Sequence, residues 1–165
     1  MKATTILGLD FGERRIGVAL SDIGKTIATG LMTIDCKQNP NYFETLGDII
    51  REEGVEAIVV GYPLRTDGKV VAGGKTEIVD TFITKLESSF KLPVYREDEA
   101  FTSQMAAQSL KARGGGGGGR SNGKRGKRGR QADKSEIDRV AACFILQDYL
   151  DAALNSKSKN PIGDE

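Results

Sequence analysis

Carboxylates are the side chains of this sequence best suited to chemistry. The chain of 165 residues contains no histidine, which excludes Ser-His and Cys-His nucleophile pairs and histidine-bound zinc. Acidic residues stand at three places of interest: Asp10 in the run Asp-Phe-Gly, the three acids at 97–99, and Asp138. If these side chains converge, their charges repel one another unless a divalent cation lies among them. Carboxylates favour hard cations, so the pattern indicates Mg²⁺ or Mn²⁺.

A cluster of this kind suits the hydrolysis of phosphodiester bonds. Two cations about 4 Å apart can activate a water molecule and stabilise the leaving oxygen. Plainer interpretations of the first two places stay open. Asp10 could simply stabilise a turn, and Glu97 or Asp98 could be the ligand in place of Glu99.

Asp138 also has a structural alternative. We expect it in the first turn of the last helix, just before the small residues at 141–142, which would let that helix approach the sheet closely. Ser135-x-x-Asp138 and Asp133-x-x-Glu136 both resemble capping boxes. An acid in the first turn is favoured by the helix dipole whatever its function.

The charge of the chain is unevenly distributed. Nine of its 24 basic residues but one of its 23 acidic residues fall at 111–134, so the rest of the chain carries a formal net charge of −7. A basic segment on an acidic body is a candidate contact for a polyanion. The expected nucleic-acid contacts, with an ordinary solvated surface as the alternative, are Arg14, Arg15, Lys124, Arg125, Lys127, Arg128 and Arg130.

Short apolar runs and turn residues predict the elements that must position these groups. Strands are expected at 5–10, 16–22 and 28–35, and their succession without a helix indicates an antiparallel start. Asn39 and Pro40 are typical of a helix N-cap and first position, and Gly54 of a helix end. The continuous apolar run at 55–61 predicts a buried parallel strand.

The second half of the chain continues the alternation of strands and helices. We expect a loop at 62–75, a helix at 75–89, a strand at 92–95, a helix from 102 or 103 to 112, and a last helix from 133 or 135 to about 154. Apolar residues at helical spacing predict the buried faces of the three longer helices. These residues are Phe43, Leu46, Ile49 and Ile50, then Ile78, Val79, Phe82, Ile83 and Leu86, then Ile137, Val140, Ala141, Phe144 and Ile145.

The predicted architecture is a single α/β domain over 1–154 with a mixed five-stranded sheet. The glycine- and arginine-rich run at 114–131 is expected to be a flexible loop, and 155–165 a polar tail. Cys36 and Cys143 follow no metal-ligand spacing, which favours packing roles in a reduced, cytoplasmic protein. No apolar run is long enough to span a membrane.

Four stretches of the chain, in order, resemble the YqgF family, also called RuvX. They are DFGERRIGVALSD, VVGYPLRTDG, REDEAFTS and KSEIDRVAACFILQDYLD. The family is described as pre-16S rRNA nucleases and, earlier, as Holliday junction resolvases. The resemblance implies an RNase H-like fold for the mixed five-stranded sheet, in which three antiparallel strands are followed by two parallel ones.

The resemblance also implies an acidic triad. Asp10 matches the first acid, Glu99 the second, with Asp98 before it, and Asp138 the third. The family's Gly-x-Pro-x-x-x-Asp-Gly loop is matched by Gly61, Pro63, Asp67 and Gly68. Of these, Asp67 is interpreted as a turn former rather than a metal ligand.

Two departures from the family pattern bear on activity. Ala100 replaces the arginine that follows the glutamate, and the glycine run at 114–119 is longer than usual. If that arginine normally contacts phosphate, either activity is weaker or another arginine takes its place.

The leading hypothesis is a metal-dependent nuclease of the two-metal type that processes the 5′ end of pre-16S rRNA during ribosome biogenesis. One alternative is a Holliday-junction resolvase acting on branched DNA, which would need a symmetric dimer. The other is an RNA-binding assembly factor without turnover, which Ala100 keeps open. The expected partner is structured RNA or branched DNA, not a membrane, and the expected state is a monomer or weak homodimer.

Overall fold

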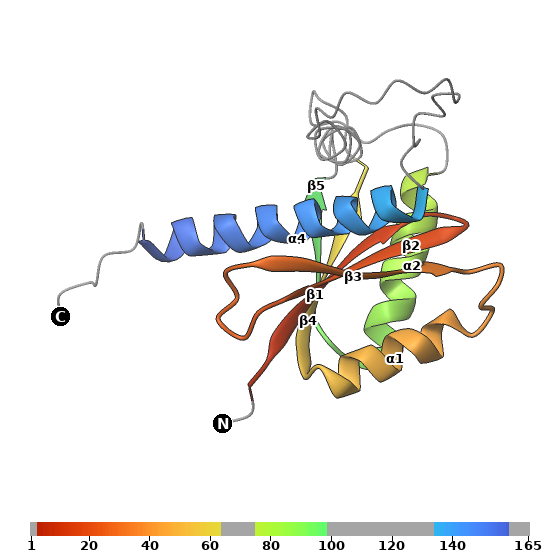
Figure 1. The fold of residues 1–165 in the computed structure, drawn as a ribbon, viewed down its shortest axis with the longest axis horizontal. Coiled ribbons are helices and arrows are strands. Elements are labelled where there is room, and N and C mark those ends of the chain that lie inside the picture. Colours follow the sequence, from red (N-terminus) through yellow and green to blue (C-terminus); the bar gives the residue numbers. More distant parts are fainter. Residues whose placement is uncertain (1–2, 64–74, 99–133, 159–165) are drawn as a thin grey trace, which may run out of the picture.

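A five-stranded sheet runs through the computed structural model, which describes residues 3–63, 75–98 and 134–158 (Figure 1). Its strands are β1 (Thr5–Phe11), β2 (Arg15–Ser21), β3 (Ala28–Asp35), β4 (Val55–Tyr62) and β5 (Val94–Asp98). They lie in the order β3-β2-β1-β4-β5. The pairs β1–β2 and β2–β3 are antiparallel, whereas β1–β4 and β4–β5 are parallel. The predicted mixed sheet is therefore confirmed.

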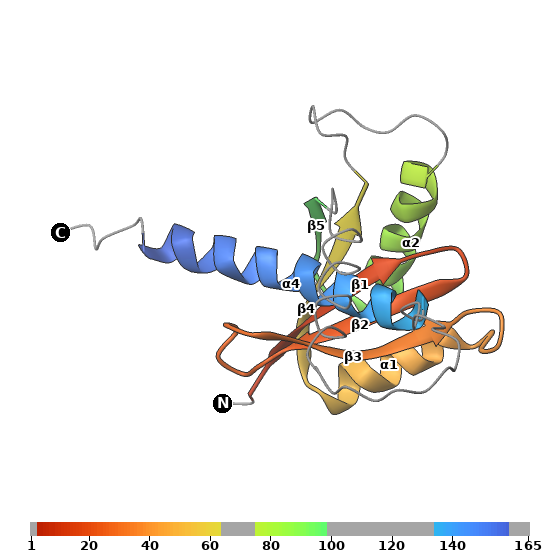
Figure 2. The ribbon, with the colours of Figure 1, turned by 45° about the horizontal axis from the view of Figure 1, so that its top comes forward.

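Helices cover both faces of this sheet. α1 (Tyr42–Glu52) and α2 (Lys75–Phe90) lie on one face, and α4 (Lys134–Ser158) crosses the other (Figures 1 and 2). Each face has its own apolar core, because side chains of a strand point alternately to the two sides. In β1, Leu7 and Leu9 pack with α1 and α2, whereas Ile6 packs with α4.

Glycines let α4 come unusually close to the sheet. A Cβ atom added to Gly8 of β1 would lie 2.6 Å from Cβ of Leu146, and one added to Gly30 of β3 would lie 2.7 Å from Cγ of Arg139. Ala142 and Ala141 on α4 are fully buried. The predicted close approach of this helix is confirmed, and the sheet contributes to it as much as the helix does.

The start of α1 differs from the prediction. Asn39 is not the N-cap; Asn41 is, and its side chain makes no capping hydrogen bond. Asn39 instead belongs to the turn after β3, where its backbone N–H donates to the carbonyl oxygen of Asp35 and its side-chain amide donates to the hydroxyl oxygen of Thr45. The predicted helix end is confirmed, because Gly54 follows α1 with a φ of 62°.

β5 is longer than predicted and shifted along the chain. Its backbone pairs with β4 through Asp98, so Glu97 and Asp98 lie within the strand and not after it. Parallel pairing with β4 outweighs the low strand preference of charged residues. Alternation then divides the strand: Tyr95 stacks on Tyr149 of α4, whereas Arg96 pairs with an acid of α2.

The buried faces of the helices were predicted in part. Leu46 and Ile49 of α1 are buried as predicted, but Ile78 of α2 is 38% exposed. On α4, Ala141 and Ile145 are buried as predicted, whereas Ile137, Val140 and Phe144 are only half-buried. The buried face is formed by Ala141, Ala142, Ile145, Leu146 and Leu150.

α4 also continues to Ser158, so the predicted polar tail begins within a helix. The predicted helix at 102–112 and loop at 114–131 lie outside the described residues. No helix in the described ranges is long and apolar enough to cross a membrane.

Candidate active site

Asp10 and Asp138 meet at one glycine of β2. Asp10 stands opposite Gly17 in the β1–β2 pair, and directly paired residues direct their side chains to the same face of a sheet. On that face, a Cβ atom added to Gly17 would lie 1.9 Å from the backbone carbonyl oxygen of Asp138. The structure therefore brings two of the three predicted acids to neighbouring positions between the sheet and α4.

The row of residues around Asp10 lies at the carboxyl edge of the parallel strands. Asp10 comes one residue after Leu9, which pairs with Val60 of β4, and the next residue of β4, Gly61, pairs with Glu97 of β5. Open α/β sheets bind ligands at this edge. Since Gly61 has no side chain, nothing from β4 stands between Asp10 and Glu97.

Arg15 holds Asp138 in place. Its Nε atom donates to Oδ2 of Asp138 at 3.1 Å, and the two side chains are only 24% and 29% exposed. Burial raises the pKa of Asp138, while Arg15 and, more weakly, Lys134 act in the opposite direction. The bond joins β2 to α4 and fixes which way the carboxylate points.

This contact changes two sequence-based interpretations. Asp138 is the fifth residue of α4 as described, so its predicted place in the first turn is wrong, and its carboxylate bonds to Arg15 of another element. Two of the arginines predicted to contact nucleic acid are described, and of these Arg15 is engaged with Asp138. Arg14 is 59% exposed, with its Nε atom 3.7 Å from Asp35.

Glu97 is the acid that the sequence could not separate from its neighbours. It is half-buried, and burial raises its pKa, with further contributions from the nearby charges of Asp148 on α4 and Asp98. Glu97 lies two residues after Tyr95, whose ring stacks on Tyr149 of α4, so its side chain is on the α4 face, the same face as Asp10. Side chains alternate between the two faces of a strand, so Glu97 can be assigned to this face only once β5 is known to reach Asp98.

Several predicted site residues lie outside the described residues. They are Glu99, Asp67, Gly68, Lys124, Arg125, Lys127, Arg128 and Arg130. Of the predicted motif loop, Gly61 is part of β4 and Pro63 is buried directly after it.

The donor chemistry of the described acids fits a divalent cation. Asp138 and Glu97 are carboxylates whose pKa values are raised by burial, and a cation beside them would favour their charged forms. Within residues 3–63, 75–98 and 134–158, no three acidic or cysteine side chains are close enough to form a complete metal site. A third ligand would have to come from another part of the chain.

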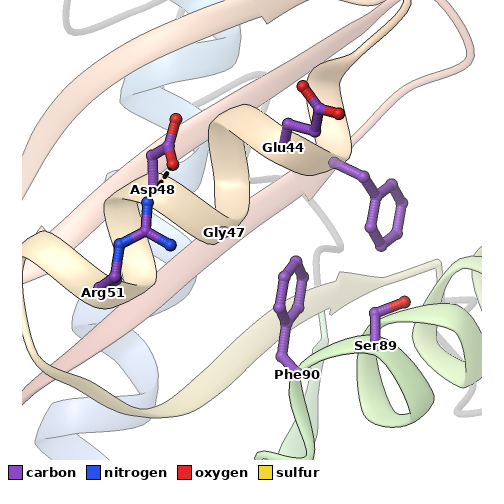
Figure 3. A pocket seen from close by; sticks show the side chains of 7 residues that line it. Glu44, Gly47, Asp48, Arg51, Ser89 and Phe90 are labelled. Atoms are coloured by element: carbon purple, nitrogen blue, oxygen red, sulfur yellow. Dashed lines mark hydrogen bonds and ion pairs between the residues drawn. The ribbon is translucent and has the colours of Figure 1, made fainter.

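A hollow of about 440 Å³ lies elsewhere, between α1 and the end of α2 (Figure 3). Phe43 and Phe90 stack across it, and Arg51 forms an ion pair with Asp48 at its rim. Because α1 and α2 lie on the sheet face opposite α4, this hollow is separate from Asp10 and Asp138.

The family model described as RuvX, Holliday junction resolvase, matches residues 4–152. A protein of Chloroflexus aggregans named "Putative pre-16S rRNA nuclease" is 39% identical over 155 residues, which cover 94% of this chain and 99% of that protein. A protein of the same name from Syntrophus aciditrophicus is 40% identical over 152 residues, covering 92% and 91% of the two chains.

Among solved structures, the fowlpox virus resolvase in complex with Holliday junction DNA matches with a TM-score of 0.50. The match covers 91% of this chain and 99% of that one, at 11% sequence identity. Together with the strand order, this likeness identifies the fold as α/β and RNase H-like, as predicted.

Proposed function

Because this chain belongs to the RuvX family, we propose that it is a metal-dependent nuclease that hydrolyses phosphodiester bonds. The observation that carries this proposal is the position of Asp10 and Asp138 on either side of Gly17, at the carboxyl edge of the parallel strands. The names of the relatives that align over nearly their whole length favour pre-16S rRNA as the substrate, and hence a role in ribosome biogenesis. We propose that the 5′ end of this RNA is the part that is processed.

Mg²⁺ or Mn²⁺ is the proposed cofactor, with Asp10 and Asp138 among its ligands. Glu99, by resemblance, is the proposed third ligand. Glu97 lies on the α4 face in the row of Asp10, but with Asp10 and Asp138 it does not form a complete metal site as described. Bound cations would activate a water molecule and stabilise the leaving oxygen, in a two-metal arrangement. Arg15 keeps the Asp138 carboxylate oriented toward the sheet.

The second candidate is the resolution of branched DNA, which the description of the matching family model favours. A resolvase that cuts two strands symmetrically needs two active sites, so this function requires a dimer. We propose a monomer or a weak homodimer, which analytical ultracentrifugation would distinguish. The free thiols of Cys36 and Cys143 fit the reducing cytoplasm, where we place the protein.

The test is cleavage of a pre-16S rRNA fragment and of a four-way DNA junction in the presence of Mn²⁺. Asp10→Asn should abolish cleavage of the true substrate while leaving the far-UV circular dichroism unchanged. Asp48→Asn is the matched control, because it removes a carboxylate from exposed α1 on the opposite face. Cleavage by Asp10→Asn at the rate of the wild type would refute the proposed site.

The same assay separates the remaining alternatives. Loss of activity in Glu99→Gln but not in Glu97→Gln would assign the third ligand to Glu99, and the reverse result would assign it to Glu97. Tight RNA binding by the wild type without any Mn²⁺-dependent product would favour an assembly factor over a nuclease.

A further inference from the structure

Arg139 lies beside the proposed site, and its arrangement is not explained by that site. It follows Asp138 directly on α4, and its side chain lies across β3, the strand at the edge of the sheet. A Cβ atom added to Gly30 of β3 would be 2.7 Å from Cγ and 3.2 Å from Cδ of Arg139. The aliphatic part of the side chain therefore occupies the place that a side chain at position 30 would fill.

The guanidinium of Arg139 has no carboxylate partner within the part of the chain that the structure describes. No acid there lies within 4.0 Å of its nitrogen atoms, although Glu136 is exposed three residues earlier on the same helix. Arg14 and Arg15, by contrast, each have an acidic neighbour. A side chain fixed along its stem and without a partner at its charged end is arranged for an external anion.

The surroundings of Arg139 favour a nucleic-acid backbone over a small anion. Lys134 is exposed at the start of α4 and close enough to act on the Asp138 carboxylate. Lys134 lies one helical turn before Asp138 on α4, and Arg139 follows Asp138 directly, with its stem over Gly30 of the edge strand. Two basic side chains of one helix next to the acid suit a chain of several phosphates better than a single small anion.

We propose that Arg139 binds a backbone phosphate of the substrate next to the one that is cleaved, over the β3 edge of the sheet. This inference rests on the proposed nuclease function. It adds the path that the nucleic-acid backbone takes beyond the acidic residues. The phosphodiester backbone is common to RNA and DNA, so the contact does not depend on which of them is cut. Packing alone is the competing explanation, since the stem of Arg139 also covers Gly30.

The test is a salt series of binding measurements by fluorescence anisotropy in EDTA, so that no cleavage occurs. The probes are a fluorescein-labelled RNA hairpin and a labelled four-way DNA junction. Each lost phosphate contact lowers the slope of log K against log salt by about 0.7 for single strands and about 0.9 for duplex. We expect Arg139→Met to show this change and to bind about tenfold more weakly at low salt, whereas Arg139→Lys keeps the slope of the wild type.

Two controls separate the contact from packing and from net charge. Methionine preserves the stem over Gly30, so Arg139→Met should unfold at the same urea concentration as the wild type. Arg51→Met removes one positive charge from α1 on the far face and should change neither slope nor affinity. An unchanged slope in Arg139→Met, or an equal loss in Arg51→Met, would overturn the proposal.

Failure of the inference is distinguishable from failure of the proposed function. If Asp10→Asn abolishes cleavage but Arg139→Met binds like the wild type, only the phosphate contact is wrong. If Arg139→Met shows the expected decrease in slope but Asp10→Asn still cleaves, the phosphate contact is supported and the assignment of the acids is wrong. If the wild type binds neither probe, both are overturned.

Discussion

Replacing Gly17 with alanine should push α4 off the sheet and displace Asp138. The added Cβ atom would start 1.9 Å from the Asp138 carbonyl oxygen and 2.4 Å from its carbonyl carbon, whereas real Cβ contacts essentially never fall below 3.0 Å. The helix must therefore retreat by about 1 Å at this point. Since the obstructing atoms belong to the backbone, no change of rotamer can relieve the contact.

The magnitude follows from two general effects. Overpacking costs about 1–3 kcal/mol, and a rigid backbone obstruction should fall near the upper end, which corresponds to a loss of roughly 10 °C in melting temperature for a chain of this size. A displacement of about 1 Å at a catalytic group costs on the order of a hundredfold in rate. Gly17→Ala should therefore cleave far more slowly even at temperatures where it is fully folded.

The assay compares thermal unfolding and Mn²⁺-dependent cleavage of Gly17→Ala with those of Gly47→Ala. Gly47 lies in α1 on the other side of the sheet, and a Cβ atom there would meet the edge of the Phe90 ring at 3.3 Å, which the side chain can accommodate. This control should gain up to about 1 kcal/mol from helix propensity and keep full activity. If Gly17→Ala matches the wild type in both measurements, α4 does not rest on β2 as described.

Two further predictions concern the buried charges. Burial raises the pKa of Asp138 and of Glu97 above their ordinary values of 3.8 and 4.5, so the folded state binds protons more tightly than the unfolded state and the wild type loses stability as pH rises through this range. In urea unfolding, the stability of Asp138→Asn and of Glu97→Gln should therefore increase relative to that of the wild type as the pH rises from 4 to 7. A difference in stability that does not depend on pH would contradict this. Arg15→Met removes the 3.1 Å bond to Asp138 and should lower the free energy of unfolding by about 2 kcal/mol. It should also raise the pKa of Asp138 further, so that the acid limb of the pH–rate profile moves to higher pH. An unmoved limb would show that Arg15 does not act on the reacting site.

Local signals were enough to predict most of the sheet. The run at 28–35 matches β3, and the continuous apolar run at 55–61 is β4, extended by Tyr62, because an interior parallel strand is apolar on both faces. Gly54 ends α1 through its positive φ, a property that glycine has in any context. Asp10 could be placed because it ends a buried run that the sequence displays directly.

Features that depend on contacts between distant segments could not be predicted. β5 continues through Glu97 because its backbone pairs with β4, and nothing in the local sequence favours a strand of charged residues. The bond from Arg15 to Asp138 spans 123 positions. Arg15 and Arg14 are equivalent in the sequence, and only the alternation of β2 decides which of them faces α4.

The glycines under α4 show why the site as a whole was beyond the reach of sequence patterns. Gly8, Gly17 and Gly30 stand at unrelated spacings along the chain, yet the strand registers bring Gly8 opposite Ala19, and Ala19 opposite Gly30, with Gly17 two residues earlier in β2. An added Cβ atom at each of the three would lie within 2.7 Å of α4. Because these three positions have no side chain, α4 can pack close to the sheet. Without these glycines Asp138 would lie farther from Asp10, and the proposed metal site would lose one of its two described ligands.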